Sequence, residues 1–211
     1  MYLSRVKLDI TLRKTRNALA NLQQMHAIVE GCFDAVSTKQ RSLWRIDTLK
    51  GSTFLLIVSS EAPDFTTLLP QLSSANSSEA ISKNYDNFLA SLAEKQNMRF
   101  RLCANPVHSV MQVGSQESRG KIFGHVTVEQ QKDWLQQRSQ KNGFELLHFD
   151  VVNRGERKFK RQKETVTLTM ATYEGLLTVC DADLLRTALT TGIGRAKAYG
   201  CGLLTLAPVL S

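Results

Sequence analysis

The segment from Leu43 to Ser59 reads LWRIDTLKGSTFLLIVS and contains two strand patterns joined by a short polar turn. Leu43–Asp47 is the first predicted strand, and Thr53–Ser59 is mostly apolar, which is typical of a buried strand. Upstream, the apolar residues of Leu22–Val36 recur with the helical period, and Tyr2–Asp9 alternates as a strand does. The start of the chain therefore predicts the order strand, helix, strand, strand.

The rest of the chain completes this unit and then repeats it. The Ser- and Asn-rich run Ser73–Ser78 is the most loop-like stretch, and a polar loop holds Gly114, Gly120 and Gly124. The remaining predicted elements are, in order, a short helix after Pro63, a strand around Tyr85–Leu89, a strand at Met98–Ala104, a helix from Val128 to Asn142-Gly143, a strand at Phe144–Val152, a hairpin of Thr165–Thr172 and Leu176–Val179 turned at Glu174-Gly175, a helix capped by Asp181 that runs to Thr191, and a strand at Leu203–Leu206. Two tandem α+β units of the split βαβ kind account for this order, with a boundary between residues 90 and 97.

Composition indicates a folded, basic protein. The chain has 211 residues, with 27 Lys and Arg against 19 Asp and Glu, so its formal charge is +8. A hydrophobic share of 42% supports a real core and argues against a disordered chain. No stretch has the roughly 20 apolar residues of a membrane span, and the N-terminus lacks the apolar run of a signal peptide. We therefore expect a cytoplasmic protein without membrane contact.

Cysteine and histidine are scattered. The cysteines (Cys32, Cys103, Cys180 and Cys201) form no CxxC pair, and each has apolar neighbours that suit burial. The four histidines show no HExxH or other short ligand spacing. Neither disulfides nor a metal site is predicted.

The densest charge feature is the run from Arg154 to Lys163, which has six basic residues in ten and a single acid. Such a run is often a solvated face. Because this one leads into a strand, alternate side chains could instead follow a phosphate backbone, with Phe159 stacking on a base or packing in the core. Nucleic acid is the leading partner.

A glycine-rich segment, GIGRAKAYGCG, spans Gly192–Gly202 and includes Arg195 and Lys197. Glycine lets backbone N–H groups approach a phosphate closely, so this segment can bind an anionic strand. It is not a Walker loop, and it follows a helix where a dinucleotide fingerprint would follow a strand. A helix cap and tight turn explain Gly192 but not all four glycines.

His26 lies in the first predicted helix. At 100° per residue, Met25, Val29 and Cys32 share the buried stripe and His26 falls at its rim. A rim histidine is more often packed than catalytic. The same position can also anchor one ring nitrogen and present the other to a ligand.

Nearly the whole chain resembles the CasE-type CRISPR repeat RNA endoribonucleases, which are type I-E Cascade subunits of the RAMP superfamily. The residues that carry the resemblance are Met1–Ser4, Met25-His26, Arg99–Pro106, Trp134-Leu135, Tyr173–Gly175 and the long block Gly192–Pro208. This resemblance implies an α+β protein of two tandem ferredoxin-like (RRM-like) βαββαβ domains, residues 1–94 and 95–211.

The resemblance also implies a function. The expected activity is metal-independent cleavage at the 3′ base of a CRISPR repeat stem-loop by 2′-OH attack, without a cofactor, followed by retention of the guide RNA with other Cascade subunits. His26 takes the catalytic position of the family. The expected RNA-binding residues are Arg157, Lys158, Lys160, Arg161 and Lys163 of a basic hairpin, and Gly192, Gly194, Arg195, Lys197, Gly200 and Gly202 of the glycine-rich loop.

Several residues depart from the family pattern. Gln23 stands where many members have tyrosine, Ala27 follows the histidine where a polar residue is usual, and Gly31 replaces a lysine that some members use. These departures leave the cleavage rate open. The alternative function is a non-catalytic RNA-binding subunit of the same fold.

Overall fold

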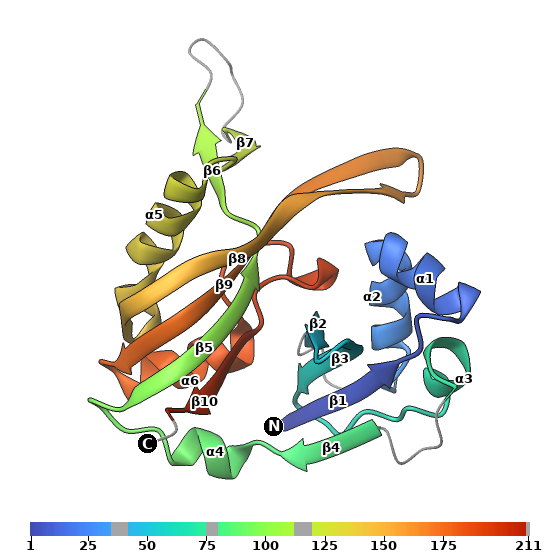
Figure 1. Ribbon diagram of the computed structural model, residues 1–211, viewed down its shortest axis with the longest axis horizontal. Helices are drawn as coiled ribbons and strands as arrows, with labels where there is room; N and C mark the ends of the chain where they lie inside the picture. The colour runs from blue at the N-terminus through green and yellow to red at the C-terminus, as the bar shows by residue number, and fades with distance from the viewer. Residues whose placement is uncertain (35–41, 75–79, 112–119, 210–211) are drawn as a thin grey trace.

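The computed structural model describes residues 1–34, 42–74, 80–111 and 120–209 (Figure 1). Two antiparallel four-stranded sheets lie side by side, each with its own helices. The chain is therefore an α+β protein of two tandem ferredoxin-like units, as predicted. Residues 35–36 of the predicted first helix, residues 75–78 of the polar run and Gly114 lie outside the described residues.

The first sheet has the strand order β2-β3-β1-β4. Its middle strands, β1 and β3, are paired antiparallel, with Val6 opposite Leu55, and both of these side chains are buried. The elements of this unit are β1 (Tyr2–Leu8), α1 (Arg13–Ala20), α2 (Leu22–Glu30), β2 (Leu43–Leu49), β3 (Ser52–Ser59), α3 (Leu69–Leu72) and β4 (Ala80–Asn84).

The second sheet has the equivalent order β10-β5-β9-β8. Its elements are β5 (Asn97–Ala104), β6 (Val107–Val110), β7 (Lys121–Gly124), α5 (Val128–Ser139), the 3-10 turn η2 (Gln140–Asn142), β8 (Phe144–Arg161), β9 (Glu164–Val179), α6 (Ala182–Thr191), the 3-10 turn η3 (Lys197–Tyr199) and β10 (Leu204–Pro208). Strands β6 and β7 form a separate ribbon inside the predicted polar loop. The predicted division at residue 94 falls between the two sheets, and the domain limits 1–94 and 95–211 stay a prediction.

The predicted strand at Tyr85–Leu89 is wrong. These residues begin the short helix α4 (Asp86–Ala90), and the edge strand β4 lies just before them. Tyr85, Leu89 and Leu92 are buried, and Phe88 stacks on Tyr85 with ring centroids 5.3 Å apart. This spacing of three to four residues is the helical period, which a short apolar run does not separate clearly from a strand.

The predicted hairpin turn at Glu174-Gly175 is also wrong. Strand β9 continues through both residues, and a Cβ at Gly175 would collide with the backbone of β8 at His148. This glycine therefore permits close strand approach instead of a turn. The actual turn is Gln162-Lys163, with Gln162 at a φ of 54°, so the basic run lies within β8 and at the hairpin tip.

Two smaller expectations need correction. Helix α2 ends at Glu30, with Gly31 as its C-cap, so residues 31–34 of the predicted helix are not helical. Cys180 is exposed, whereas Cys32, Cys103 and Cys201 are buried as expected.

A buried arginine joins the two units. Arg45 of β2 is 2% exposed, and its Nη1 donates to the backbone oxygens of Arg101 and Leu203, at 2.8 and 2.9 Å. Its Nε and Nη2 donate to the Asp47 carboxylate, and Nη2 also reaches Thr205 Oγ1. Because an unpaired buried charge is costly, this clamp fixes β2 against β5 and β10.

Candidate functional site

Helix α2 presents His26 at the edge of a buried face. Asn21 caps the helix by accepting from the N–H groups of Gln23 and Gln24, at 3.1 and 3.4 Å. Met25 and Val29 are fully buried, whereas the His26 side chain is 26% exposed. The His26 Nδ1 atom is buried and makes no hydrogen bond to the described residues. Nε2 is therefore the ring nitrogen that can reach a substrate.

Glu30 stands one helical turn beyond His26. Its Oε1 lies 3.8 Å from His26 Nδ1, an ion pair whenever the imidazole is protonated. The same oxygen accepts from Ser42 Oγ at 2.7 Å, so the carboxylate is also held by the residue that precedes β2. Sequence reasoning missed Glu30, although its spacing of four residues places it on the same helix face as His26.

The glycine-rich segment forms a tight loop after α6. Gly192, Gly194, Gly200 and Gly202 all have positive φ angles, between 78° and 91°. A Cβ at Gly200 would come within 2.8 Å of the buried Trp44 ring. Glycine at these positions therefore allows a backbone path that a larger side chain would block.

The two basic residues of this loop lie differently. Arg195 is exposed. Lys197 donates from Nζ to the Thr191 carbonyl at 2.6 Å, at the carboxyl end of α6. Lys197 therefore has a role in holding the loop against the helix end.

The hairpin formed by β8 and β9 reaches from the second sheet toward α2 (Figure 1). Phe159 of β8 is buried and packs in one cluster with Met25 of α2 and Leu168 of β9. Its ring therefore serves packing, which resolves the two alternatives left by the sequence. Side chains alternate along a strand, so the neighbouring Lys158 and Lys160 project from the opposite face of the hairpin. Both are exposed, and Lys158 lies 3.5 Å from Glu156.

Tyr199 connects all three features. Its ring lies 4.7 Å from that of Phe159 and 6.3 Å, edge-on, from that of His26, measured between centroids. Its hydroxyl donates to Gln23 Oε1 at 3.1 Å. The glycine-rich loop, the hairpin and the predicted catalytic helix therefore meet around one phenol. Sequence reasoning assigned no role to Tyr199, although it stands within the glycine run.

Thiols near the site are poor nucleophiles. Burial, with smaller effects from Asp64 and Glu30, raises the pKa of Cys32 to about 12. A hydrogen bond with Cys103 and burial raise the pKa of Cys201, which lies within the glycine-rich loop. Because the thiolate is the reactive form, these groups offer no covalent chemistry near neutral pH.

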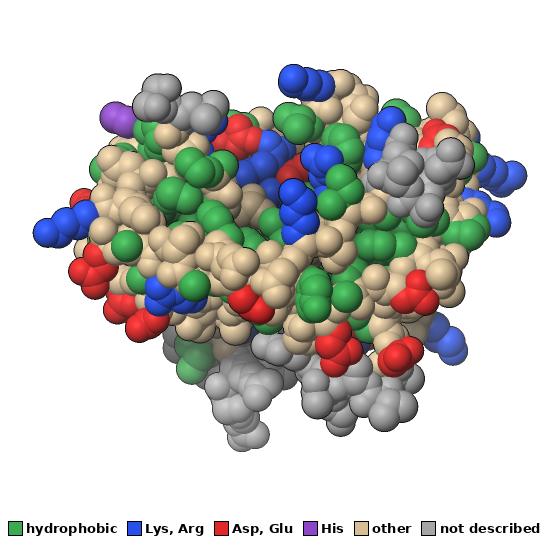
Figure 2. All heavy atoms as spheres, turned by 90° about the horizontal axis from the view of Figure 1, so that it is seen from below, with side chains coloured by type: hydrophobic (Ala, Val, Ile, Leu, Met, Phe, Trp, Pro, Cys, Tyr) green, Lys and Arg blue, Asp and Glu red, His purple; other side chains and the backbone are tan. Residues whose placement is uncertain are grey.

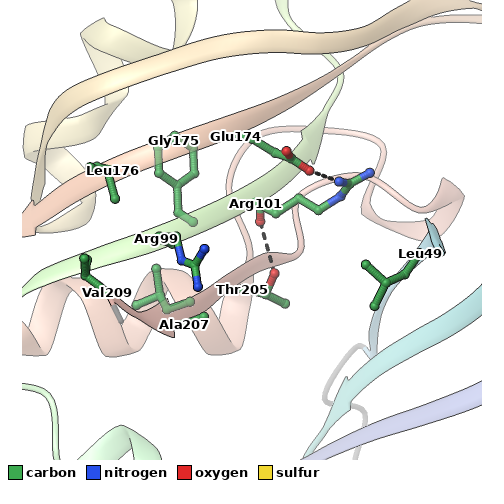
Figure 3. A pocket seen from close by; sticks show the side chains of 11 residues that line it. Leu49, Arg99, Arg101, Glu174, Gly175, Leu176, Thr205, Ala207 and Val209 are labelled. Atoms are coloured by element: carbon green, nitrogen blue, oxygen red, sulfur yellow. Dashed lines mark hydrogen bonds and ion pairs between the residues drawn. The ribbon is translucent and has the colours of Figure 1, made fainter. Parts of the chain in front are cut away.

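An open groove of about 800 Å³ lies against β5, β9 and β10. Arg101 pairs with Glu174 there, and Leu49 and Val209 lie at its sides (Figure 3). Viewed from below, the molecule shows hydrophobic and charged side chains around a hollow (Figure 2). None of the predicted catalytic or RNA-binding residues lines the groove, so it is separate from the His26 site.

Within residues 1–34, 42–74, 80–111 and 120–209, no three His, Cys, Asp or Glu side chains gather as a metal site would require. In the same part of the chain, no helix is long and apolar enough to cross a bilayer.

A family model described as CRISPR associated protein matches residues 1–208. The chain belongs to this CRISPR-associated protein family. A curated relative of this family member is the CRISPR-associated endoribonuclease Cse3 of Thermus thermophilus, which is 26% identical over 226 residues, covering 99% of this chain and 100% of the relative. The Cascade subunit CasE of Escherichia coli is 31% identical over 115 residues, covering 52% of this chain and 57% of CasE.

The fold of this CRISPR-associated protein also matches a solved RNA complex. The structure of Thermus thermophilus Cse3 bound to an RNA representing a pre-cleavage complex has a TM-score of 0.82 and 25% sequence identity. The match covers 98% of both chains. The two units and their arrangement are therefore shared with an RNA-bound endoribonuclease.

Proposed function

We propose that this CRISPR-associated protein is a CRISPR repeat RNA endoribonuclease. It binds the repeat stem-loop, cleaves once at the 3′ base of the stem, and stays attached to the guide RNA within Cascade. The observation that carries this proposal is the meeting of His26, the glycine-rich loop and the basic hairpin around Tyr199. The full-length similarity to Cse3 and the similarity to CasE support the choice of RNA as substrate.

The ribose 2′-OH supplies the nucleophile. As the 2′ oxygen bonds to phosphorus, the bond from phosphorus to the 5′ oxygen breaks, which leaves a 2′,3′-cyclic phosphate and a 5′-OH end. A base takes the 2′ proton and an acid gives a proton to the 5′ oxygen. His26 Nε2 serves one of these two roles, and positioning and charge supply the rest of the acceleration. The internal nucleophile is the reason for proposing a metal-independent reaction.

RNA binding is assigned to two surfaces. Arg157, Lys158, Lys160, Arg161 and Lys163 of the hairpin contact phosphates of the stem, because basic side chains there displace counterions. In the loop, the exposed Gly194 allows close backbone approach to the strand near the cut, and Arg195 and Lys197 add positive charge. Gly192, Gly200 and Gly202 are buried, so they contribute by setting the path of the loop.

The test uses the full-length protein and its repeat transcript. His26→Ala should leave RNA affinity and thermal stability nearly unchanged and slow single-turnover cleavage by at least the ~10²-fold typical of a lost general acid or base. His148→Ala, an exposed histidine of β8, is the matched control and should cleave normally. A destabilised His26→Ala protein with a normal rate would make His26 a packing residue.

Two conditions test the nucleophile. A chelator should leave the rate unchanged, and a single deoxyribose 5′ of the cut should abolish cleavage. Cleavage of the deoxy substrate would mean that an external water attacks. A wild type that binds its repeat hairpin and never cuts would point to the non-catalytic alternative.

A further inference from the structure

Tyr199 and Gln23 form a hydrogen-bonded pair across the site. They lie 176 residues apart in the chain, and the phenol hydroxyl donates to the amide oxygen Oε1 at 3.1 Å. Both side chains are partly buried. Positive φ angles at Ala196 (60°) and Gly200 (78°) flank the 3-10 turn η3, which carries Tyr199 toward α2. The conformation of the loop thus places this hydroxyl beside the Gln23 side chain.

The pair fixes the direction of the Gln23 amide. A carboxamide has one oxygen acceptor and an NH₂ group with two donors. Because Oε1 is engaged by Tyr199, the other end of the amide presents Nε2, for which no hydrogen bond is found among the described residues. Gln23 and His26 are three residues apart on α2, so their side chains are neighbours on one helix face.

We propose that Tyr199 is a positioning residue for RNA cleavage: it holds Gln23 so that the amide Nε2 donates to a non-bridging oxygen of the scissile phosphate beside His26. Gln23 is then a catalytic residue, because it touches the reacting group. This inference rests on the proposed function and adds a named donor for the phosphate.

Such a donor would favour the reaction. Negative charge builds on the non-bridging oxygens when the 2′ oxygen attacks, and a donor fixed in advance lowers the barrier because it need not reorganise. Neither Gln23 nor Tyr199 forms or breaks a covalent bond in this step, and neither gains or loses a proton. The proton transfers remain with His26 and a second group.

Packing offers a competing role for Tyr199. Its ring contacts Phe159 and His26, so a large truncation would disturb the hairpin and the helix together. Tyr199→Phe removes only the hydroxyl and keeps the ring. Tyr2→Phe on β1 is the matched control for loss of a phenol hydroxyl, and Gln24→Met, at an exposed position of the same helix, is the control for Gln23→Met.

The experiment is a double-mutant cycle on single-turnover cleavage of the repeat transcript, with RNA affinity and thermal midpoint measured on the same samples. Tyr199→Phe should slow cleavage by about 3- to 10-fold, the effect of one neutral hydrogen bond. Gln23→Met should slow it by about 10²-fold, as expected for a lost oxyanion donor. Both should bind RNA as the wild type does.

The decisive measurement is the double variant Gln23→Met/Tyr199→Phe. It should cleave no more slowly than Gln23→Met alone, because Tyr199 acts only through Gln23. A further loss by the full Tyr199→Phe factor would overturn the inference, and so would a normal rate for Tyr199→Phe or weaker RNA binding with a normal rate. If the wild type fails to cut, or His26→Ala cuts normally, the proposed function itself fails. If the wild type cuts and His26→Ala does not, but Tyr199→Phe cuts at the wild-type rate, only this inference fails.

Discussion

Removing the positive charges of Lys158 and Lys160, on the hairpin face opposite Phe159, is the most direct test of RNA binding. The perturbation is Lys158→Gln with Lys160→Gln, which leaves the packed Phe159 between them untouched. Both lysines are exposed, and the ion pair of Lys158 with Glu156 is itself at the surface and contributes little. We therefore expect folding to be unaffected and the loss to appear in RNA affinity.

The magnitude follows from counterion release. Each phosphate contact contributes about 0.9 to the slope of log affinity against log salt, so two lost contacts should reduce the slope by about 1.8. Over a fourfold rise in salt, from about 50 to about 200 mM, the wild type should then lose about tenfold more affinity than the variant.

The assay is a filter-binding titration, at four salt concentrations, of a repeat RNA stem-loop that a single deoxyribose 5′ of the cut makes non-cleavable. Lys83→Gln with Lys141→Gln is the matched control, because these exposed lysines lie outside the hairpin, on β4 and η2. An unchanged slope in the hairpin variant, or an equal change in the control, would refute the assignment of stem binding to the hairpin.

Three further predictions concern stability and the loop. Arg45→Met should reduce the free energy of unfolding by about 3 kcal/mol, because the buried carbonyls of Arg101 and Leu203 lose their donor and Asp47 keeps only Arg101 as a partner. Urea denaturation measures this loss, with the exposed Arg99→Met as the control. Equal losses in the two variants would contradict the stabilising role of Arg45. Gly200→Ala should slow cleavage and destabilise the fold more than Gly51→Ala, since both have positive φ but only the first would meet a side chain, that of Trp44; indistinguishable melting midpoints would argue against that contact. Desolvation, with smaller effects of His108 and Arg138, lowers the pKa of His125 below its ordinary 6.5. The unfolded chain therefore binds the proton more readily than the folded protein, and stability should fall as pH drops below about 6.5. Urea midpoints measured between about pH 7.5 and 5 should fall less for His125→Asn than for the wild type, and an identical fall would exclude His125 as the cause.

The sequence by itself determined the order of most elements and the identity of the main functional features. Periodicity placed the strands at Tyr2 and Leu43, and the predicted cap Asp181 does begin α6. These signals are local, because a cap or an apolar stripe involves residues within one or two turns. The rim position of His26 followed from the same geometry.

Local signals failed where a distant strand decided the conformation. Gly175 resembles a turn residue, but its role is to let β8 pass close to β9. Residues 85–89 resemble a strand, yet their apolar side chains pack as a helix against the core. The real hairpin turn, Gln162-Lys163, lacks the Asn-Gly or Asp-Gly signature, so the sequence gives little indication of it.

Tertiary structure alone decided how the site is assembled. No spacing rule connects Gln23 to Tyr199 across 176 residues, and only the packing of the second unit on the first brings the phenol to helix α2. The same packing buries Phe159 and leaves Lys158 and Lys160 open. Contacts of this kind depend on how two folded units dock, a long-range arrangement that the residues of either segment do not encode locally.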